Sequence, residues 1–419
     1  MRVIGVAAVA VCVVLTAAGC REDGGDATPR PGASAAVPAG SGPGPRTDQT
    51  FKISRTVPAT EAREALPRGP WQRVHYVAGQ NGGRTTKPLA VTAAGELVVA
   101  MSPPAKTGNE TVAIGQSRVG LWNGSGFHPF PLPAGYGGPP RQTAGGTERD
   151  GVAVWAETAS TDLYRFDWRV YAYDAATGRT RLLGDSAAMA PKAWLPLGPG
   201  NGEPVIGDRT AYWSTTYPTE DEREFGMRVM KRPVTGEGTL DVAVDQAKFP
   251  AAAGSDLYYV RSHDVAPRFP EGRYEIRRLT PAGDDQAVAA GPLGAEQEVS
   301  KLVAEGERLA WVVSSPSDER STLYLRDSAD NEAVAFPLEH AAPWTMYVNL
   351  TSSLLTWSNG SASGDAGQYV YELSGQRLWR LGTVDGHSIV HGSGNAVAWS
   401  ELSADNVSAY HTAIWKPTG

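Results

Sequence analysis

The residues that most often carry metal or acid-base chemistry are few and scattered in this chain of 419 residues. Of seven histidines, only His387 and His391 are four residues apart, and they flank a predicted strand. Residues i and i+4 of a strand share a face but lie about 13 Å apart, too far to bind one metal ion. The sequence contains no HExxH, GxSxG, CxxC, P-loop or EF-hand pattern. We therefore predict no metal site, no cofactor and no catalytic residue defined by a motif.

Three long segments hold most of the remaining candidates, because they mix carboxylates, arginines and aromatic residues. They are "ETASTDLYRFDW" (157–168), "TTYPTEDEREFG" (215–226) and "SHDVAPRFPEG" (262–272). Each lies in a predicted loop, and functional residues gather on loops held by a rigid scaffold. Carboxylates on such loops could also include a pair of the kind used by glycosidases, although their spacing in the sequence identifies none. The predicted binding face consists of Asp162, Tyr164, Arg165, Trp194, Tyr217, Asp221, Arg223, His263, Arg268 and Trp344.

A repeated pattern predicts the scaffold that positions these loops. "KLVAEGERLAW" (301–311) and "IVHGSGNAVAW" (389–399) both read as strand, tight turn and strand, with almost no shared residues. The same form recurs seven times at intervals of about 50 residues, as expected for a repeat architecture. Most copies are followed by two more alternating runs, such as "VYAYDAATGRTRLL" (170–183). Alternation at period two indicates half-buried antiparallel strands. The unit is a four-stranded meander, which is the form of a β-propeller blade.

The last unit lacks a fourth strand, because the sequence ends at Gly419 soon after "TAIW". An unpaired edge in the ring would invite aggregation. The segment "WQRVHYV" (71–77) alternates well and precedes the first full unit, so we expect it to close the ring by pairing with the final unit. The fold class is therefore predicted to be all-β, a propeller of seven four-stranded blades. Six blades with one irregular insertion is the alternative.

Tryptophan recurs at equivalent points in the second strand of the units. A row of such rings could form a platform for carbohydrate, but these positions are where blade packs on blade. Burial of large rings stabilises a core strongly. We therefore predict that the following residues form core: Trp155, Trp213, Trp311, Trp357 and Trp399.

The first twenty residues, "MRVIGVAAVAVCVVLTAAGC", differ from the rest of the chain. Arg2 precedes an apolar run of signal-peptide length, and the run ends in small residues before Cys20. "AAGC" resembles the lipobox of bacterial lipoproteins, which implies removal of residues 1–19 and acylation of Cys20. The other cysteine, Cys12, lies within the segment that would be removed, so no internal disulfide is expected. Residues 20–69 are rich in Gly, Pro, Ala and Ser and are predicted to tether the propeller, residues 70–419, to the membrane.

From about Trp71 to Gly419 the chain resembles the TolB-like and WD40-like propellers of exported lipoproteins from high-GC actinobacteria. The resemblance implies an architecture and an extracytoplasmic location more than a function, because fold alone does not define chemistry. The repeated Gly-His and Trp-Asp pairs of true WD40 domains are missing, as are the Asp boxes of sialidases. "AYDAATG" (172–178) resembles the turn motif of quinoprotein propellers, but it occurs once.

A net charge of −7 gives no basic surface for nucleic acid, so no nucleic-acid partner is predicted. The primary hypothesis is a monomeric, non-catalytic binding or scaffold module, anchored by lipid on Cys20, that recognises a protein or envelope ligand. The alternative is an enzyme that acts on a glycan or peptide with carboxylates near the central channel. The absence of a metal or nucleophile motif favours the first hypothesis, and turnover abolished by one Asp or Glu substitution would establish the second.

Overall fold

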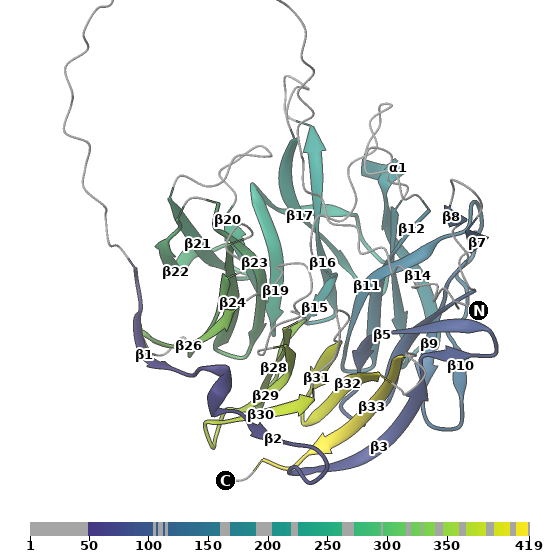
Figure 1. Ribbon diagram of the computed structural model, residues 1–419. Helices are drawn as coiled ribbons and strands as arrows, with labels where there is room; N and C mark the ends of the chain where they lie inside the picture. The colour runs from purple at the N-terminus through teal and green to yellow at the C-terminus, as the bar shows by residue number, and fades with distance from the viewer. Residues whose placement is uncertain are drawn as a thin grey trace, which may run out of the picture.

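The chain forms seven small sheets arranged around a common centre, which is a seven-bladed β-propeller (Figure 1). The prediction of an all-β propeller is confirmed, and the six-bladed alternative is excluded. The computed structural model describes residues 49–103, 106–107, 112–113, 116–159, 168–189, 203–218, 225–261, 272–294, 296–315, 320–327, 330–339, 347–359, 366–382, 389–402 and 408–417.

Each blade is an antiparallel meander of four strands, numbered here from the centre outward. Blade 1 consists of β5 (Arg84–Val91), β6 (Leu97–Ser102), β9 (Arg118–Trp122) and β10 (Phe127–Pro129), and blade 2 of β11 (Gln142–Arg149), β12 (Val152–Thr158), β13 (Trp168–Asp174) and β14 (Arg179–Asp185). Blade 3 consists of β15 (Val205–Gly207), β16 (Thr210–Pro218), β17 (Phe225–Pro233) and β18 (Asp241–Asp245), and blade 4 of β19 (Ala247–Ala253), β20 (Asp256–Arg261), β21 (Arg273–Leu279) and β22 (Asp285–Pro292). Blade 5 consists of β23 (Glu298–Glu305), β24 (Arg308–Ser315), β25 (Arg320–Asp327) and β26 (Glu332–Glu339). Blade 6 consists of β27 (Val348–Leu350), β28 (Leu354–Asn359), β29 (Gly367–Glu372) and β30 (Arg377–Gly382). Blade 7 consists of β31 (Val390–Ser393), β32 (Ala396–Leu402), β33 (Ser408–Trp415) and β3 (Trp71–Ala78).

Short elements accompany the blades. They are β4 (Gln80–Asn81) beside β5, the hairpin of β7 (Lys106–Thr107) and β8 (Val112–Ala113), the 3-10 turn η1 (Ala59–Glu61) and the helix α1 (Ser186–Met189). In the part of the chain that the structure describes, no helix has the length and apolar character needed to cross a membrane.

The repeated pattern in the sequence corresponds to the two inner strands of each blade. In blades 5 and 7 the turn between them contains Gly306 and Gly394, whose φ angles are 57° and 56°. Glycine adopts this left-handed conformation without the steric cost that a Cβ imposes. The tryptophans that end the pattern are core residues as predicted, since the five are between 0% and 4% exposed.

The ring closes as predicted, because β3 pairs with β33 in antiparallel register from Trp71 opposite Trp415 to Ala78 opposite Ala409. An early segment of the chain therefore supplies the outer strand of the last blade. This closure satisfies the outer edge of β33, which would otherwise present unpaired backbone groups.

The predicted tether, residues 20–69, needs a correction at its end. From Gln49 onward the chain packs along the outside of the ring, where β1 (Lys52–Thr56) pairs in parallel with β26 and β2 (Arg63–Glu64) with β30. Phe51, Val57 and Ala65 are 5%, 1% and 0% exposed, so this part is a strap that covers the edges of blades 5 and 6 (Figure 1). The prediction relied on the composition of the whole segment, which does not show that three widely spaced residues in it are buried.

The seven innermost strands contact one another in cyclic order, from β5 through β11, β15, β19, β23 and β27 to β31 and back to β5. Figure 1 shows β11, β15, β19 and β31 near the middle of the ring. Side chains that point inward from these strands line the central channel, where residues far apart in the sequence meet.

Candidate functional site

An ion pair crosses the central channel. The Lys301 ammonium, on β23 of blade 5, lies 3.4 Å from the carboxylate of Glu203, which precedes β15 of blade 3. Blade 4 separates these two blades around the ring, so the pair spans the channel and does not join neighbours. The side chains are 19% and 29% exposed, so solvent reaches them but does not surround them. Such a pair can exchange a proton through the carboxylate and stabilise negative charge through the ammonium group.

Local backbone geometry sets the directions in which the side chains of Glu203 and Lys301 point. A bulge separates Val299 from Lys301 in the pairing of β23 with β24, and bulges re-aim the residue that follows them. Opposite, Glu203 lies against Gly145 of β11, where an added Cβ would come within 2.8 Å of the Glu203 Cγ. The site therefore needs glycine at position 145 to leave room for the carboxylate arm.

A buried histidine lies beside this pair. His391 on β31 is 3% exposed, and its electrostatic neighbours include Glu203, Lys301 and Lys87. Burial lowers the pKa of His391 to about 4, so its imidazole is neutral at pH 7. The imidazole hydrogen-bonds the Pro88 backbone, while its Nε2 has no hydrogen-bond partner among the described residues. Because this nitrogen is buried, the imidazole borders the pair as a neutral group closed to solvent.

Lys87 completes this set, which we call the channel cluster: Lys87, Glu203, Lys301 and His391. Lys87 lies on β5, and its ammonium group donates to the Ala144 carbonyl of β11 at 2.8 Å. The cluster thus draws on the inner strands of blades 1, 5 and 7 and on the residue that leads into blade 3.

Two further ion pairs line the same channel. Lys248 of blade 4 lies 3.5 Å from Glu298 of blade 5, and Arg149 of blade 2 lies 2.7 Å from Glu305 of blade 5. The second pair also crosses the ring, and Arg149 donates to the Ala252 carbonyl of blade 4 at 3.1 Å. Glu305 ends β23 at the tight turns, whereas Lys301 lies farther from them. The Arg149–Glu305 pair therefore lies at the tight-turn end of the inner strands, and the channel cluster lies farther from that end.

One strained residue borders these pairs. Phe249 on β19 has a φ of 52°, an unusual value for a bulky side chain. It lies in a bulge between Lys248 and Ala251, and its N–H donates to the Ser214 hydroxyl at 3.1 Å. Strain of this kind often occurs next to functional sites.

A second buried carboxylate lies between blades 1 and 2. Glu157, 2% exposed, accepts hydrogen bonds from the Trp155 indole at 2.9 Å and from the Tyr136 hydroxyl at 3.0 Å. Burial raises the pKa of Glu157, and the positive charges of Arg141 and Arg169 oppose that rise. This group is well satisfied by its protein partners, which is the behaviour of a carboxylate that holds two blades together.

Among the described residues, no three His, Cys, Asp or Glu side chains gather in a way that could hold a metal ion. His391 is described and lies in the channel, whereas His387, its neighbour in the sequence, lies outside the described residues.

Of the predicted binding face, the structure describes only Tyr217, near the end of β16. The Arg228 guanidinium lies over its ring at 3.6 Å, and the ring covers Gly226 on the adjacent strand. Tyr217 thus packs within its own blade. The other residues of that face lie outside the described part of the chain: Asp162, Tyr164, Arg165, Trp194, Asp221, Arg223, His263, Arg268 and Trp344. Cys20, the predicted lipidation site, also lies outside it.

The channel cluster was not among the residues singled out by motif or loop composition. Lys301 falls within the repeated pattern itself, and Glu203 lies five residues before the turn of the equivalent pattern in blade 3. A charged residue facing inward at this point of an otherwise apolar inner strand is the signal that could have identified them.

No protein-family model and no curated protein sequence matches the chain. Solved structures do resemble it. An oligogalacturonate lyase from Vibrio parahaemolyticus is 11% identical, with a TM-score of 0.51 over 82% of this chain and 95% of that one. An oligogalacturonate lyase in complex with manganese is 12% identical, with a TM-score of 0.49 over 82% and 97%. A puromycin hydrolase is 17% identical, with a TM-score of 0.48 over 78% of this chain and 51% of that one.

The likeness to the lyase from Vibrio parahaemolyticus shows a shared propeller fold. The chain spans about half the length of the puromycin hydrolase (51%). The expectation of a non-catalytic binding or scaffold module is contradicted, because the solved propeller that matches this chain with a TM-score of 0.51 is an oligogalacturonate lyase. The prediction relied on the absence of sequence motifs. Motifs record residues that are close in sequence, whereas the charged groups in this channel come from five different blades.

Proposed function

We propose that this chain is an enzyme built on a seven-bladed propeller and that it acts on a glycan or a peptide at the central channel. The observation that carries the proposal is the Glu203–Lys301 pair, whose charged atoms lie 3.4 Å apart across the channel. Half-buried charges of opposite sign that face one solvent-accessible space are the groups that acid-base chemistry needs.

In the proposed mechanism Glu203 transfers the proton. Hydrolysis of a glycosidic or peptide bond and elimination from a sugar acid all need a group that takes or gives a proton at the reacting atom. The Lys301 ammonium would stabilise negative charge that develops on the substrate next to that atom. His391, neutral at pH 7 because burial lowers its pKa to about 4, would act as a buried neighbour of the pair and not as a group that contacts substrate, since its Nε2 is closed to solvent.

The experiment compares the wild-type chain with Glu203→Gln on a panel of glycans and peptides, with products separated by chromatography. The name of the oligogalacturonate lyase suggests oligosaccharides of uronic acids as the first substrates to test. Loss of the proton-transferring carboxylate should lower kcat/KM by about 100-fold or more.

The matched control is Glu332→Gln, an exposed glutamate on β26 at the outside of blade 5. Its turnover should stay within about twofold of wild type, since surface substitutions away from the site change little. The proposal fails if Glu203→Gln turns over as fast as wild type. It also fails if a folded wild-type chain turns over none of the panel.

We also propose that the enzyme works outside the cytoplasm, held at the membrane by lipid on Cys20. Support comes from the "AAGC" sequence and from the position of the other cysteine, Cys12, within the signal-like segment. The acyl chains would supply the membrane affinity by burying methylene groups.

A further inference from the structure

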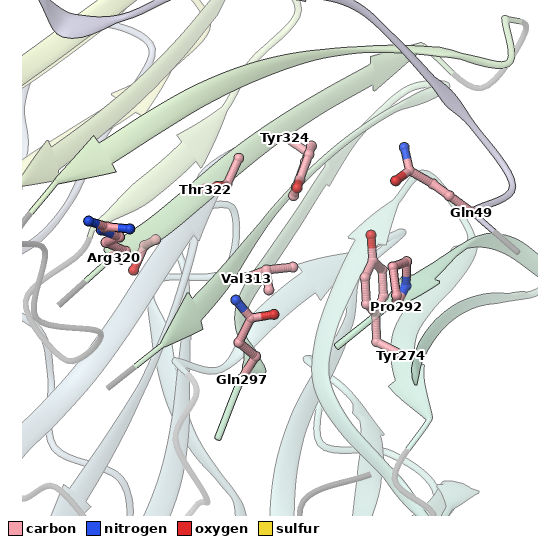
Figure 2. Close-up of a pocket in the computed structure, with 9 residues that line it drawn as sticks. Gln49, Tyr274, Pro292, Gln297, Val313, Arg320, Thr322 and Tyr324 are labelled. Atoms are coloured by element: carbon pink, nitrogen blue, oxygen red, sulfur yellow. The ribbon is translucent and has the colours of Figure 1, made fainter. Parts of the chain in front are cut away.

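A cavity of about 250 Å³ lies between blades 4 and 5, away from the central channel. Figure 2 shows Gln49 and Arg320 on opposite sides of it, with Thr322, Val313 and Tyr324 between them. The remaining lining residues are Tyr274, Pro292, Gln297 and Ser321. The volume is slightly below that of drug-sized ligand sites, so it suits a single sugar or the end of a short peptide.

The strap closes the outer side of this cavity. Thr50 joins it to blade 4, since its N–H donates to the Ala290 carbonyl at 3.1 Å and its hydroxyl accepts from the Ala290 N–H at 2.9 Å. Phe51 packs edge-on against Trp311 and Tyr324 of blade 5, with ring centroids 5.2 and 5.7 Å apart. The cavity is therefore a built feature of the closed ring, with a wall that bridges two blades.

Three of the residues that line the cavity offer free hydrogen-bond donors. Gln297 uses its carbonyl oxygen to accept from the Gly294 N–H at 2.8 Å, which leaves its amide NH₂ to donate. The Tyr274 hydroxyl oxygen accepts from the Trp311 indole at 3.2 Å, which leaves its own proton to donate. Burial raises the pKa of Tyr274, so that proton is retained at neutral pH.

Arg320 adds a positive charge at the start of β25. No hydrogen bond or ion pair joins its exposed guanidinium to another residue in the described part of the chain. A free guanidinium that lines the same cavity as an amide donor and a phenol donor provides partners for a carboxylate and a nearby hydroxyl. The faces of Tyr274, Tyr324 and Pro292 supply apolar surface for the carbon skeleton that carries it.

We propose that the cavity between blades 4 and 5 is a second binding site, separate from the channel cluster, for a small ligand that carries a carboxylate. Arg320 would pair with the carboxylate, and Gln297 and Tyr274 would donate to its oxygens or to an adjacent hydroxyl. Two sources share this chemistry, a sugar acid and the carboxyl end of a peptide.

Calorimetric titration of the full chain tests the proposal with two pairs of probes. Galacturonate is compared with galactose, and a dipeptide is compared with its C-terminal amide. In each pair only the first member carries a free carboxylate, so at least one carboxylate should bind more tightly than its neutral partner. The pair that shows the larger difference identifies the source of the ligand.

Two variants locate the binding. Arg320→Gln should weaken binding of the carboxylate about tenfold or more, because a charge-assisted pair is lost. The matched control is Arg308→Gln, a partly exposed arginine of blade 5 whose guanidinium lies 3.5 Å from Asp327 beside the tight turn, and it should bind as wild type does. Glu203→Gln should also bind as wild type does, which separates this site from the proposed catalytic one.

Three results would overturn the proposal. The first is a wild-type chain that binds neither carboxylate at concentrations up to about 50 mM, far above the usual range of substrate constants. The second is equal affinity in wild type and Arg320→Gln, which would place the binding elsewhere. The third is loss of binding in Glu203→Gln, which would place it in the channel.

Discussion

Acidification should destabilise this protein through one buried histidine. The ordinary pKa of histidine is 6.5, and burial of His391 lowers its pKa to about 4. Because the folded state resists protonation, the stabilising effect of the neutral imidazole is complete above pH 6.5. It is lost as the pH falls from 6.5 through about 4. The difference between the two pKa values corresponds to about 3 kcal/mol of folding free energy at the acid end.

The variant that isolates this effect is His391→Asn, which does not titrate and retains an N–H that can donate to the Pro88 backbone. Urea unfolding, followed by tryptophan fluorescence at pH 7.5, 5.5 and 4, gives the unfolding free energy of both proteins. Carboxylates that titrate over the same range affect both proteins equally, so they cancel in the comparison. Relative to wild type, the variant should gain about 3 kcal/mol between pH 7.5 and pH 4.

A surface histidine provides the control. His128 is exposed, and its ring nitrogen hydrogen-bonds Ser125 and Asn123. His128→Asn should therefore follow the wild-type pH dependence within about 0.5 kcal/mol. If His391→Asn also runs parallel to wild type from pH 7.5 to pH 4, the imidazole titrates normally. The reasoning from burial would then be refuted.

Three further predictions concern other parts of the chain. Burial raises the pKa of Glu148 to about 7, so the folded state loses stability as the pH rises from 4.5 to 7. In urea unfolding, Glu148→Gln should therefore raise the unfolding free energy by up to about 3 kcal/mol at pH 8 and change it little at pH 4. Deletion through residue 48 should leave the melting temperature unchanged, whereas deletion through Gly69 should lower it by about 5 °C or more, because Phe51 and the edge strands are lost. Equal melting temperatures would contradict a structural role for the strap. Cys20→Ala should release the protein from membranes and remove the acyl mass expected in mass spectrometry of the wild type. A variant that stays in the membrane at the mass expected for acylation would exclude Cys20 as the site of the lipid.

The sequence was sufficient to predict the blade, the ring and its closure, because each depends on a local pattern. A strand, a glycine-bearing turn and a second strand ending in Trp are all encoded within about eleven residues, as in 301–311. The closing strand at Trp71–Ala78 could be identified because the final unit is one strand short. These features follow from period-two alternation and from the need to pair every edge.

The strap was missed for a physical reason. Its burial depends on three residues, Phe51, Val57 and Ala65, separated by polar and proline-containing stretches. Its strands β1 and β2 pair in parallel at the outer edge of the ring, and their mostly exposed residues show no alternation of apolar and polar side chains. Composition alone therefore assigned it to the tether.

The channel cluster was missed because its geometry exists only in the closed ring. Glu203 and Lys301 are 98 positions apart in the chain, and no local spacing relates them. Each is placed by a local feature, the room beside Gly145 for one and the bulge after Val299 for the other. Those features can be recognised in a structure, but in the sequence they look like an ordinary glycine and an ordinary strand.

Ring closure and the two proposed sites are therefore physically linked. Pairs such as Lys301–Glu203 and Arg149–Glu305 join blades that are not neighbours, so they form only when all seven blades are in place. The cavity between blades 4 and 5 likewise has its outer wall only when the strap has joined Thr50 to Ala290. Because the strap continues directly into the closing strand β3, one N-terminal segment both completes the ring and completes the second site. Loosening that segment should therefore affect ligand binding at the cavity before it affects the channel, since the channel depends on β3 and the cavity depends on the residues that precede it.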